Sequence, residues 1–389
     1  MILALNVGSA SLKFALHADD EALTRVLAGT VAADRGGTRL STDPGRGIPA
    51  LDAGLDGPAT EAGEVLPQVF EHLRRLGVAD AIAAVGHRIV HGGTTFAAPA
   101  HLTPGAVEAL EALAPRAPAH QPAGLAGVAA AARAFPEAAQ VGCFDTAFHA
   151  DQPRVARLYG LPRRLTEQGI IGYGFHGLSY AYIASVLRRR FGESAGGRAI
   201  VAHLGSGVSL CAMAAGRSVA TTMGFSTLDG PPMATRSGAL DPGVVLHLIQ
   251  GLGMTAEAVG EMLHRQSGLL GVSGISGDLR DLLASDQPAA AEATALFAYR
   301  IGREIGSLAA ALGGLDTLVF TAGVGENAPA VRARIAEAAA WLGVALDARR
   351  NQAGDTRISA DGARVEVLVL PTDEQHSIAQ GVQAWLRRG

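Results

Sequence analysis

Residues 5–16, LNVGSASLKFAL, and residues 199–222, AIVAHLGSGVSLCAMAAGRSVATT, open the two halves of this chain in the same way. Each stretch begins with an apolar run typical of a buried strand, turns at Gly and Ser, and continues as a second strand. A third strand follows in both halves, at residues 24–32 and at the end of the second stretch. The Gly8-Ser9 and Gly205-Ser206 turns are about 200 residues apart, which indicates that a whole domain is duplicated.

Alternating helical and strand patterns follow the three strands in each half. In the first half they predict helices near 60–77 and 105–113 and strands at 80–85 and 139–144. In the second half they predict a helix at 289–312, a strand at 315–320, a helix at 329–342 and a strand at 365–370. Three meandering strands followed by alternating helices and strands, given twice, predict two similar α/β domains that face each other across a cleft.

The Gly/Ser turns also suggest a ligand, because backbone N–H groups in such turns form concavities that bind anions. Two of them at equivalent positions favour a phosphate clamp over two ordinary hairpin turns. The first hairpin carries Lys13, the single lysine of the chain, whereas every other cationic side chain is arginine. An ammonium is a compact point charge, and a guanidinium is a broad fork. We therefore hypothesise that Lys13 lies beside a phosphate; the alternative is a surface lysine that survived by chance.

A third glycine loop, FTAGVGENAP at residues 320–329, lies between a predicted strand and a predicted helix. Gly323, Gly325 and Ala328 form a GxGxxA pattern with Asp347 further on, so an NAD-dependent oxidoreductase must be considered. Its late position in a duplicated half argues against that function, because a dinucleotide-binding unit normally opens its domain. The glycines still allow a nucleotide to approach closely, and no Walker A lysine loop occurs in the chain.

The composition excludes several classes of function. Hydrophobic residues make up 48% of the 389 residues, and the net charge of -4 without a basic block argues against a nucleic-acid partner. No uninterrupted apolar run reaches the ~18 residues that would span a bilayer, so no membrane contact is expected. Cys143 and Cys211 lie in strand-like runs and indicate a reducing compartment without disulfides. We therefore expect a soluble cytoplasmic protein.

Nine motifs, in a fixed order, extend essentially over the whole chain. They are NVGSASLKF (6–14), VGHRIVHGG (85–93), FDTAFH (144–149), YGFHGLSY (173–180), HLGSGVS (203–209), MGFSTLDGPPMATRSGALDP (223–242), SGDLRDL (276–282), FTAGVGEN (320–327) and PTDE (371–374). This order resembles the acetate kinases, a family of the acetate and sugar kinase, chaperone and actin superfamily. The resemblance implies a duplicated ribonuclease H-like (actin-like ATPase) α/β fold with βββαβαβα domains. It implies an N-terminal domain of residues 1–146 plus 376–389 and a C-terminal nucleotide-binding domain of residues 147–375.

The resemblance further implies reversible, in-line phosphoryl transfer from ATP to acetate, or to a closely related short-chain carboxylate, giving ADP and an acyl phosphate. Mg²⁺ is the expected metal, with Mn²⁺ as a substitute, and the expected assembly is a cytoplasmic homodimer that serves acetyl-CoA biosynthesis. A carboxylate nucleophile is already ionised and needs no catalytic base. It needs cations that hold two anions together and absorb charge on the transferring group.

Individual positions also match the motifs of the family. The two matched arginines would hold the carboxylate and the transferring phosphoryl group, and the matched carboxylates would organise Mg²⁺. The catalytic positions are Arg88, Asp145, His176 and Arg236, and the metal positions are Asn6 and Glu374. The nucleotide and phosphate positions are Ser11, Lys13, His203, Leu204, Gly205, Ser206, Gly207, Asp278, Leu279, Arg280, Gly323, Val324, Gly325, Glu326 and Asn327. The substrate positions are Arg88, Val90, Ala119, His120, Phe175 and Thr227.

Several residues depart from the family pattern. Ser206 replaces an asparagine, Tyr180 a histidine and Gln375 a glutamate. In the acyl pocket Ala119 stands where the family more often has leucine, and Thr227 where it has proline. Removing about three carbon atoms of wall predicts a wider pocket, so a propionate kinase is one alternative. The other alternative is an actin- or chaperone-type ATPase without kinase activity.

Overall fold

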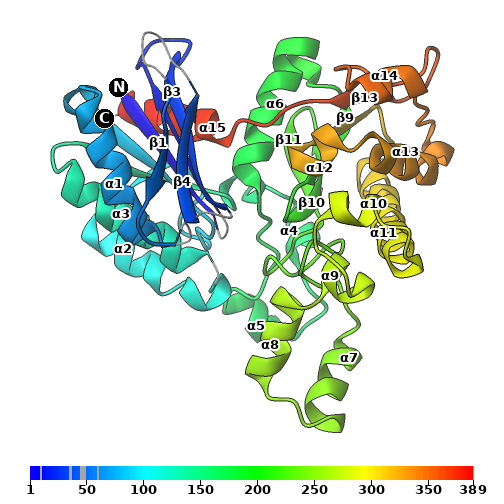
Figure 1. The fold of residues 1–389 in the computed structure, drawn as a ribbon. Helices are drawn as coiled ribbons and strands as arrows, with labels where there is room; N and C mark the ends of the chain where they lie inside the picture. The colour runs from blue at the N-terminus through cyan, green and yellow to red at the C-terminus, as the bar shows by residue number, and fades with distance from the viewer. Residues whose placement is uncertain (9–10, 35–36, 44–49, 59–60, 119, 389) are drawn as a thin grey trace. The chain divides into compact units, whose positions relative to one another are not determined.

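The structure, a computed structural model, describes residues 1–8, 11–34, 37–43, 50–58, 61–118 and 120–388. The chain divides into two compact units, which can be followed by residue number in Figure 1. Unit 1 comprises Met1–Ala150, His176–Tyr182 and Asp373–Gly389, and unit 2 comprises Asp151–Phe175 and Ile183–Thr372. The chain therefore returns to unit 1 twice, briefly at His176–Tyr182 and again for its last helix.

The sheet of unit 1 contains β1 (Ile2–Val7), β2 (Ser11–His17), β3 (Arg25–Asp34), β4 (Gly37–Asp43), β5 (Asp52–Leu55), β6 (Ala84–Ile89), β7 (Ala100–His101) and β8 (Ala139–Phe144). Its spatial order is β5-β4-β3-β2-β1-β6-β8-β7. The first five strands form an antiparallel meander, and β1, β6 and β8 are parallel neighbours. The carboxyl ends of these three parallel strands consequently lie at one edge of the sheet.

Strand β1 is buried on both faces, and its alternation sends successive side chains into two different cores. Leu3 and Leu5 join the core formed with α1 (Ala62–Arg75) and α3 (Gln121–Ala134). Ile2 and Ala4 join the core on the other face, where α15 (Glu374–Leu386) packs against β1 and β6. A Cβ added at Gly86 would lie 2.5 Å from a side-chain carbon of α15, so this close approach requires glycine.

The sheet of unit 2 contains β9 (Arg198–Leu204), β10 (Val208–Ala214), β11 (Arg217–Thr221), β12 (Thr317–Thr321) and β13 (Glu366–Val369). Its spatial order is β11-β10-β9-β12-β13, with β9, β12 and β13 parallel. Counted along the chain, this is third, second, first, fourth, fifth. The corresponding strands of unit 1, β3-β2-β1-β6-β8, have the same order. The predicted duplication and the ribonuclease H-like fold class are confirmed.

The remaining helices are mostly short, apart from α6 and the long α11 that packs along the sheet of unit 2 (Figure 1). They are α2 (Pro104–Glu111), α4 (Arg154–Arg157), α5 (Arg163–Glu167), α6 (Gly177–Phe191), α7 (Pro242–Leu246), α8 (Ala256–Arg265), α9 (Gly268–Ser273), α10 (Leu279–Leu283), α11 (Pro288–Leu312), α12 (Ala322–Asn327), α13 (Pro329–Ala338) and α14 (Ala348–Ala353). Among the described residues, no helix is long and apolar enough to cross a membrane.

The strand predicted at 80–85 is misplaced. Residues Ala79–Ala81 form a 3-10 turn, and β6 begins at Ala84 and continues to Ile89. The apolar residues at 82–85 suggested the strand, but its true extent follows from pairing with β1 and β8. This pairing includes the polar residues His87 and Arg88, which a local apolar pattern does not indicate. The helix predicted at 329–342 also ends early, at Ala338, and β4, β5 and β7 were not anticipated.

His87 gives the first testable prediction, because it is buried in β6 with its Nε2 atom 2.8 Å from Oε1 of Gln140. Burial lowers the pKa of His87 from 6.5 to about 4, although the bond to Gln140 opposes this shift. The unfolded chain therefore takes up a proton as the pH falls below 6.5, whereas the folded chain does not until about pH 4. The contribution of His87 to the free energy of unfolding is therefore complete above pH 6.5. It is lost as the pH falls from 6.5 to about 4, a decrease of roughly 3 kcal/mol.

Urea unfolding of the wild type and of His87→Asn between pH 4 and pH 7 isolates this contribution from the titration of other groups. The difference in unfolding free energy between the two proteins should shrink as the pH falls. Free-energy curves that run parallel over the whole range would contradict the assignment.

Candidate active site

Four polar side chains of unit 1 form one connected group at the carboxyl ends of its parallel strands. Arg88 donates from Nε to both carboxylate oxygens of Asp145, at 3.2 and 3.0 Å, and from Nη2 to Oδ2 at 2.7 Å. Its Nη1 donates to Oδ1 of Asn6 at 3.2 Å, and Nδ2 of Asn6 donates to Glu374 at 2.6 Å. One arginine is thus held by a carboxylate on one side and by an amide on the other.

The fold explains why these residues meet. Arg88 is the fifth residue of β6, Asp145 directly follows β8, and Asn6 lies near the end of β1, so three adjacent parallel strands supply them. In open α/β sheets, ligands bind outside the carboxyl ends of such strands. Glu374 begins α15, which packs against β1. Residues far apart in the sequence therefore converge because their strands are neighbours.

Burial makes the charges in this group strongly interdependent. The Asp145 side chain is 1% exposed and that of Arg88 is 13% exposed. Burial raises the pKa of the Asp145 carboxyl, whereas the guanidinium of Arg88 opposes that rise. For Arg88, burial acts to lower the pKa, but the carboxylates of Asp145 and Glu374 raise it above its ordinary value. The Arg88 cation is therefore permanent, and Asp145 is its counter-ion.

His176 is connected to the backbone of Asp145 through Gly177, its neighbour in the chain. The backbone of His176 adopts the left-handed conformation, with φ of 57°. The N–H group of Gly177 donates to the carbonyl oxygen of Asp145 at 2.9 Å. A Cβ added at Gly177 would lie only 2.0 Å from that oxygen, so the contact requires glycine. The GFHG motif thus places His176 one residue from a fixed point on the Asp145 backbone.

Other predicted residues of unit 1 take less central positions. Lys13 lies directly opposite Asn6 in the β1–β2 ladder, so the two side chains share a face of the sheet, and Lys13 is exposed. Ser11 begins β2, but its side chain is outside the described part of the structure. His120 precedes α3 and is half-buried, and Val90, two residues after Arg88 in the chain, is buried. Ala119 lies outside the described residues.

Tyr180 shows what one departure from the family pattern does. Its side chain is fully buried, with its ring centroid 5.6 Å from that of His149 and 6.2 Å from that of Phe148. The tyrosine therefore fills space in the core of unit 1, behind the segment that carries His176.

Unit 2 contains a pocket of about 640 Å³ at the ends of β9 and β12. Eight of the predicted nucleotide residues line it: Gly205, Ser206, Asp278, Leu279, Arg280, Gly323, Val324 and Asn327. The rest of its wall was not predicted as nucleotide-binding: Ala234, Thr235, Leu269, Gly277, Leu283, Phe297 and Ala328. These are mainly small or apolar residues; Leu269, Leu283 and Phe297 lie outside the motifs, and the other four lie within the motif segments. They suit the flat, largely apolar surface of a nucleotide base.

Two glycine loops meet in this pocket. A Cβ added at Gly205 would lie 3.8 Å from Cβ of Ala322, which places the turn after β9 beside α12, the short helix that residues 322–327 form where a loop was predicted. A Cβ added at Gly323 would meet no protein atom within 4 Å. The protein itself therefore tolerates a side chain there, and the open space remains for a ligand. Five predicted residues do not line the pocket but belong to β9, to the turn after it and to α12: His203, Leu204, Gly207, Gly325 and Glu326.

Glu326 and Asn327 also hold their own loop in shape. The Glu326 carboxylate accepts from the backbone N–H groups of Ala322, at 2.8 Å, and Thr372, at 3.3 Å. Nδ2 of Asn327 donates to the carbonyl oxygen of Gly323 at 2.9 Å. These bonds keep the loop closed around its positive-φ residue Ala322.

Asp278 and Arg280 form an exposed pair at the rim of the pocket. Asp278 begins α10 as its N-cap and accepts from the N–H group of Arg280 at 2.8 Å. The Arg280 guanidinium lies against the Asp278 carboxylate, and this hydrogen bond lowers the pKa of Asp278. Because the Arg280 side chain is 89% exposed, its charge remains available to a ligand.

Arg236 belongs to unit 2 and is half-buried. Its Nη1 donates to the carbonyl oxygen of Thr227 at 3.0 Å, so this arginine and the predicted acyl-pocket residue share one site. Thr227 and Phe175 are both buried. Val90, the other described apolar residue of the predicted acyl pocket, belongs to unit 1.

The donor set of unit 1 suits a hard divalent cation. Asn6, Asp145 and Glu374 offer carboxylate and amide oxygens, the ligands that Mg²⁺ takes in proteins. No group of three or more His, Cys, Asp or Glu residues in the described structure could form an all-protein cage. The arrangement therefore fits a metal that completes its coordination shell with water and phosphate oxygens, as Mg²⁺ usually does.

Five strands of each sheet follow the same spatial order, and a pocket lined by glycines lies at the strand ends of unit 2. Together these features define a duplicated actin-like ATPase fold. Residues 1–380 match the model of the acetokinase family, and the chain belongs to this family. It is 48% identical over 395 residues to the acetate kinase of Rhodopseudomonas palustris (strain TIE-1), covering 98% of this chain and 97% of that protein. The predicted family and enzyme class are confirmed.

Solved structures agree with the sequence comparison. A propionate kinase from Francisella tularensis subsp. tularensis SCHU S4 superposes with a TM-score of 0.89 at 33% identity, covering 98% of both chains. The acetate kinase of Porphyromonas gingivalis gives a TM-score of 0.85 at 34% identity, covering 99% of both chains. Family membership implies ATP or ADP and a divalent metal as cofactors.

The NAD-dependent alternative finds no support in the structure. Asp347, the residue that would bind a ribose, instead caps α14 by accepting from the N–H group of Arg350 at 2.9 Å. In addition, β12, which precedes the GxGxxA loop, is the fourth strand of its sheet along the chain, not the first. Of the GxGxxA residues, Gly323 and Ala328 line the pocket of unit 2.

Proposed function

We propose that this chain catalyses the reversible transfer of the terminal phosphoryl group of ATP to acetate, giving acetyl phosphate and ADP. A carboxylate oxygen attacks the γ-phosphorus in line, and the bond from that phosphorus to the β–γ bridging oxygen breaks. The observation that supports this most strongly is the state of Asp145. Its buried carboxylate accepts three hydrogen bonds from Arg88, which suits a counter-ion and not a general base. An acceptor that is already ionised needs no base.

The proposed roles follow from charge. The Arg88 cation, held rigid by Asp145 and Asn6, would face the acceptor carboxylate and the phosphoryl oxygens. Arg236, from unit 2, would face the same phosphoryl group, and His176 would donate a hydrogen bond to it. Preorganised donors of this kind lower the barrier because they need not reorient as charge develops. The pocket of unit 2, which Ser206 helps to line, would hold the nucleotide.

Mg²⁺ is the proposed metal, with Mn²⁺ as a substitute, and it would neutralise charge on the phosphates. Asn6, Asp145 and Glu374 would hold it, directly or through water. In this proposal residues 1–146 plus 376–389 and residues 147–375 act as the two functional domains. In-line transfer requires both sets of residues to reach one phosphoryl group, and closure would exclude water that could take it.

A hydroxamate assay tests the function directly. The protein is incubated with ATP, Mg²⁺, hydroxylamine and a series of carboxylic acids, and acyl phosphate is trapped as the hydroxamate. We expect product with acetate and ADP formation in equal amount. ATP hydrolysis without hydroxamate would favour the actin- or chaperone-type ATPase instead.

Propionate is the second candidate substrate, favoured by Ala119, which stands where the family resemblance predicts a larger leucine in the acyl pocket. We expect kcat/KM for propionate to be at least equal to that for acetate, because each methylene that fills apolar space is worth roughly 0.8 kcal/mol. Acetate should still react, since one methylene discriminates by at most about 10–200-fold. Initial rates with both acids measure the ratio.

Ala119→Leu is the matched control, because it restores the wall that the family more often has. This variant should shift the preference toward acetate while leaving KM for ATP unchanged. A wild-type kcat/KM for acetate more than about tenfold above that for propionate would contradict the wider pocket.

The assembly and location form the last part of the proposal. We propose a cytoplasmic homodimer, as the family resemblance implies, acting in acetyl-CoA biosynthesis. Large apolar side chains of unit 2 offer surface for self-association: Leu246 is 53% exposed, Leu252 is 63% exposed and Val244 is 45% exposed. Sedimentation equilibrium would show twice the chain mass of 39.7 kDa.

A further inference from the structure

Arg332, on α13, is the largest fully buried side chain of the described structure, at 1% exposure. Its Nη1 donates to the carbonyl oxygens of Gly325, at 2.9 Å, and Glu326, at 2.8 Å. Both acceptors lie at the end of α12, whose first residues line the nucleotide pocket. A buried arginine therefore bonds to the end of α12, the helix whose first residues line the pocket.

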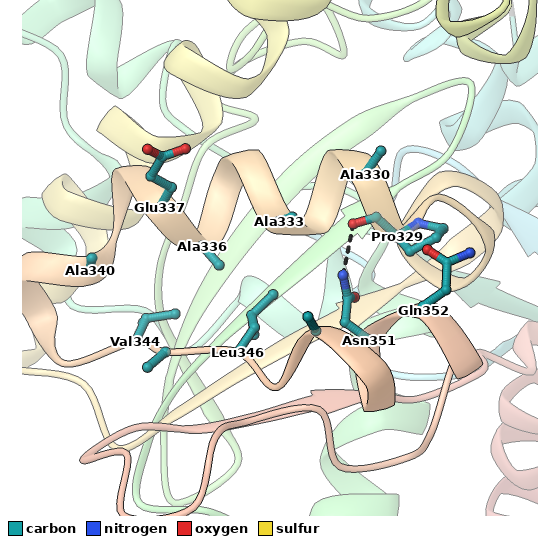
Figure 2. A pocket seen from close by; sticks show the side chains of 12 residues that line it. Pro329, Ala330, Ala333, Ala336, Glu337, Ala340, Val344, Leu346, Asn351 and Gln352 are labelled. Atoms are coloured by element: carbon teal, nitrogen blue, oxygen red, sulfur yellow. Dashed lines mark hydrogen bonds between the residues drawn. The ribbon is translucent and has the colours of Figure 1, made fainter.

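The other half of the guanidinium fork is fixed by one residue of α14. Nε donates to Oδ1 of Asn351 at 2.9 Å, and Nη2 donates to its carbonyl oxygen at 2.7 Å. Nδ2 of Asn351 in turn donates to the carbonyl oxygen of Pro329 at 2.9 Å, the bond drawn as a dashed line in Figure 2. Asn351 is itself buried, so it joins α14, Arg332 and the start of α13 into one unit.

Burying Arg332 in this arrangement costs folding free energy. Every acceptor of Arg332 within the described residues is a neutral carbonyl or amide oxygen, and burial lowers the pKa of the guanidinium. A buried charge without a counter-ion is strongly unfavourable, and a leucine or methionine would fill the space without that cost. The planar fork, however, binds four oxygens in a fixed geometry that an apolar side chain cannot reproduce.

We propose that Arg332 is a positioning residue for the nucleotide, with Asn351 as its partner. It fixes the carbonyl oxygens of Gly325 and Glu326, and thereby the orientation of Gly323, Val324 and Asn327, which line the pocket on the other side of the same helical turn. This inference rests on the proposed nucleotide-binding function of that pocket. Arg332 does not touch the ligand and acts only through the loop.

The test compares Arg332→Met with Arg334→Met, whose side chain is exposed on the same helix. For Arg332→Met we expect KM for ATP and Kd for ADP, the latter by calorimetry, to rise about tenfold or more, because several bonds to a charged group are lost. KM for acetate should stay within about twofold and kcat should fall less than KM for ATP rises. Arg334→Met should change none of these.

Arg332→Lys is the second variant, in case Arg332→Met does not fold. It keeps the charge but cannot span all the acceptors, so a smaller rise in Kd for ADP, about threefold, is expected. Unchanged Kd for ADP in a folded variant, or equal rises in KM for ATP and acetate, would overturn the inference while leaving the proposed function intact. Failure of the wild type to bind ADP would overturn both.

Discussion

Arg88→Ala should lower kcat by about 10³-fold or more and should also destabilise unit 1. The rate falls because a cation that stabilises charge on the transferring phosphoryl group is gone, and the effect on KM for ATP should be small. The stability falls because Asp145 is 1% exposed and would lose its counter-ion. Removing one partner of a buried ion pair costs about 3–5 kcal/mol. Initial rates and urea unfolding measure the two effects separately.

A second substitution distinguishes these effects. In the double variant Arg88→Ala/Asp145→Asn the buried carboxylate is replaced by a neutral amide of the same shape, so most of the lost stability should return. The rate should remain low, because no cation has been restored. If the single variant keeps more than about a tenth of the wild-type kcat, Arg88 does not have the catalytic role proposed for it.

Arg236→Ala should produce a comparable loss of kcat, roughly 10³–10⁵-fold, but with little loss of stability. The structural difference from Arg88 explains the contrast. Arg236 is half-buried and donates to the carbonyl oxygen of Thr227 at 3.0 Å, whereas Arg88 is the counter-ion of a buried carboxylate. Truncation of Arg236 removes a hydrogen bond to a neutral carbonyl oxygen, which costs less than removing the counter-ion of a buried carboxylate. Rates, KM for both substrates and the urea midpoint are the measurements.

Arg265→Ala is a suitable control for Arg236→Ala. Arg265 lies on α8 of the same unit, 70% exposed, in an i,i+4 pair with Glu261. Such exposed pairs contribute little, so this variant should be close to wild type in rate and stability. A loss of urea stability for Arg236→Ala similar to that of Arg88→Ala would mean that Arg236 is a structural residue.

The strand pattern shows where local sequence was sufficient. β1 and the β9–β10 hairpin have the predicted positions, because alternation and Gly/Ser turns reflect local burial and local backbone geometry. β6 could not be placed in this way. Half of its ladder consists of Gly86, His87 and Arg88, which become strand only because β1 and β8 lie on either side.

The same distinction between local sequence and tertiary contacts applies to the candidate site. Arg88, Asp145 and Glu374 were selected by motif, and the glycine loops by composition, so the amino-acid sequence by itself determined the family, the duplicated fold class and the candidate residues. Only the tertiary structure decided that Arg88 is bonded to Asp145 and Asn6 at once. These partners come from three strands that are adjacent in space and distant in the chain, and no local pattern records such distances.

The apolar wall of the pocket in unit 2 and the proposed role of Arg332 depend even more on tertiary structure. In the sequence, Arg332 is one of the many arginines of the chain, and it lies in an alanine-rich segment. Arg332 differs from the others in its burial and in its hydrogen-bond acceptors on α12 and α14. Both features arise because α12, α13 and α14 pack together. Residue type and spacing report what a side chain can do, whereas burial and partners, which decide what it does, arise when the chain folds.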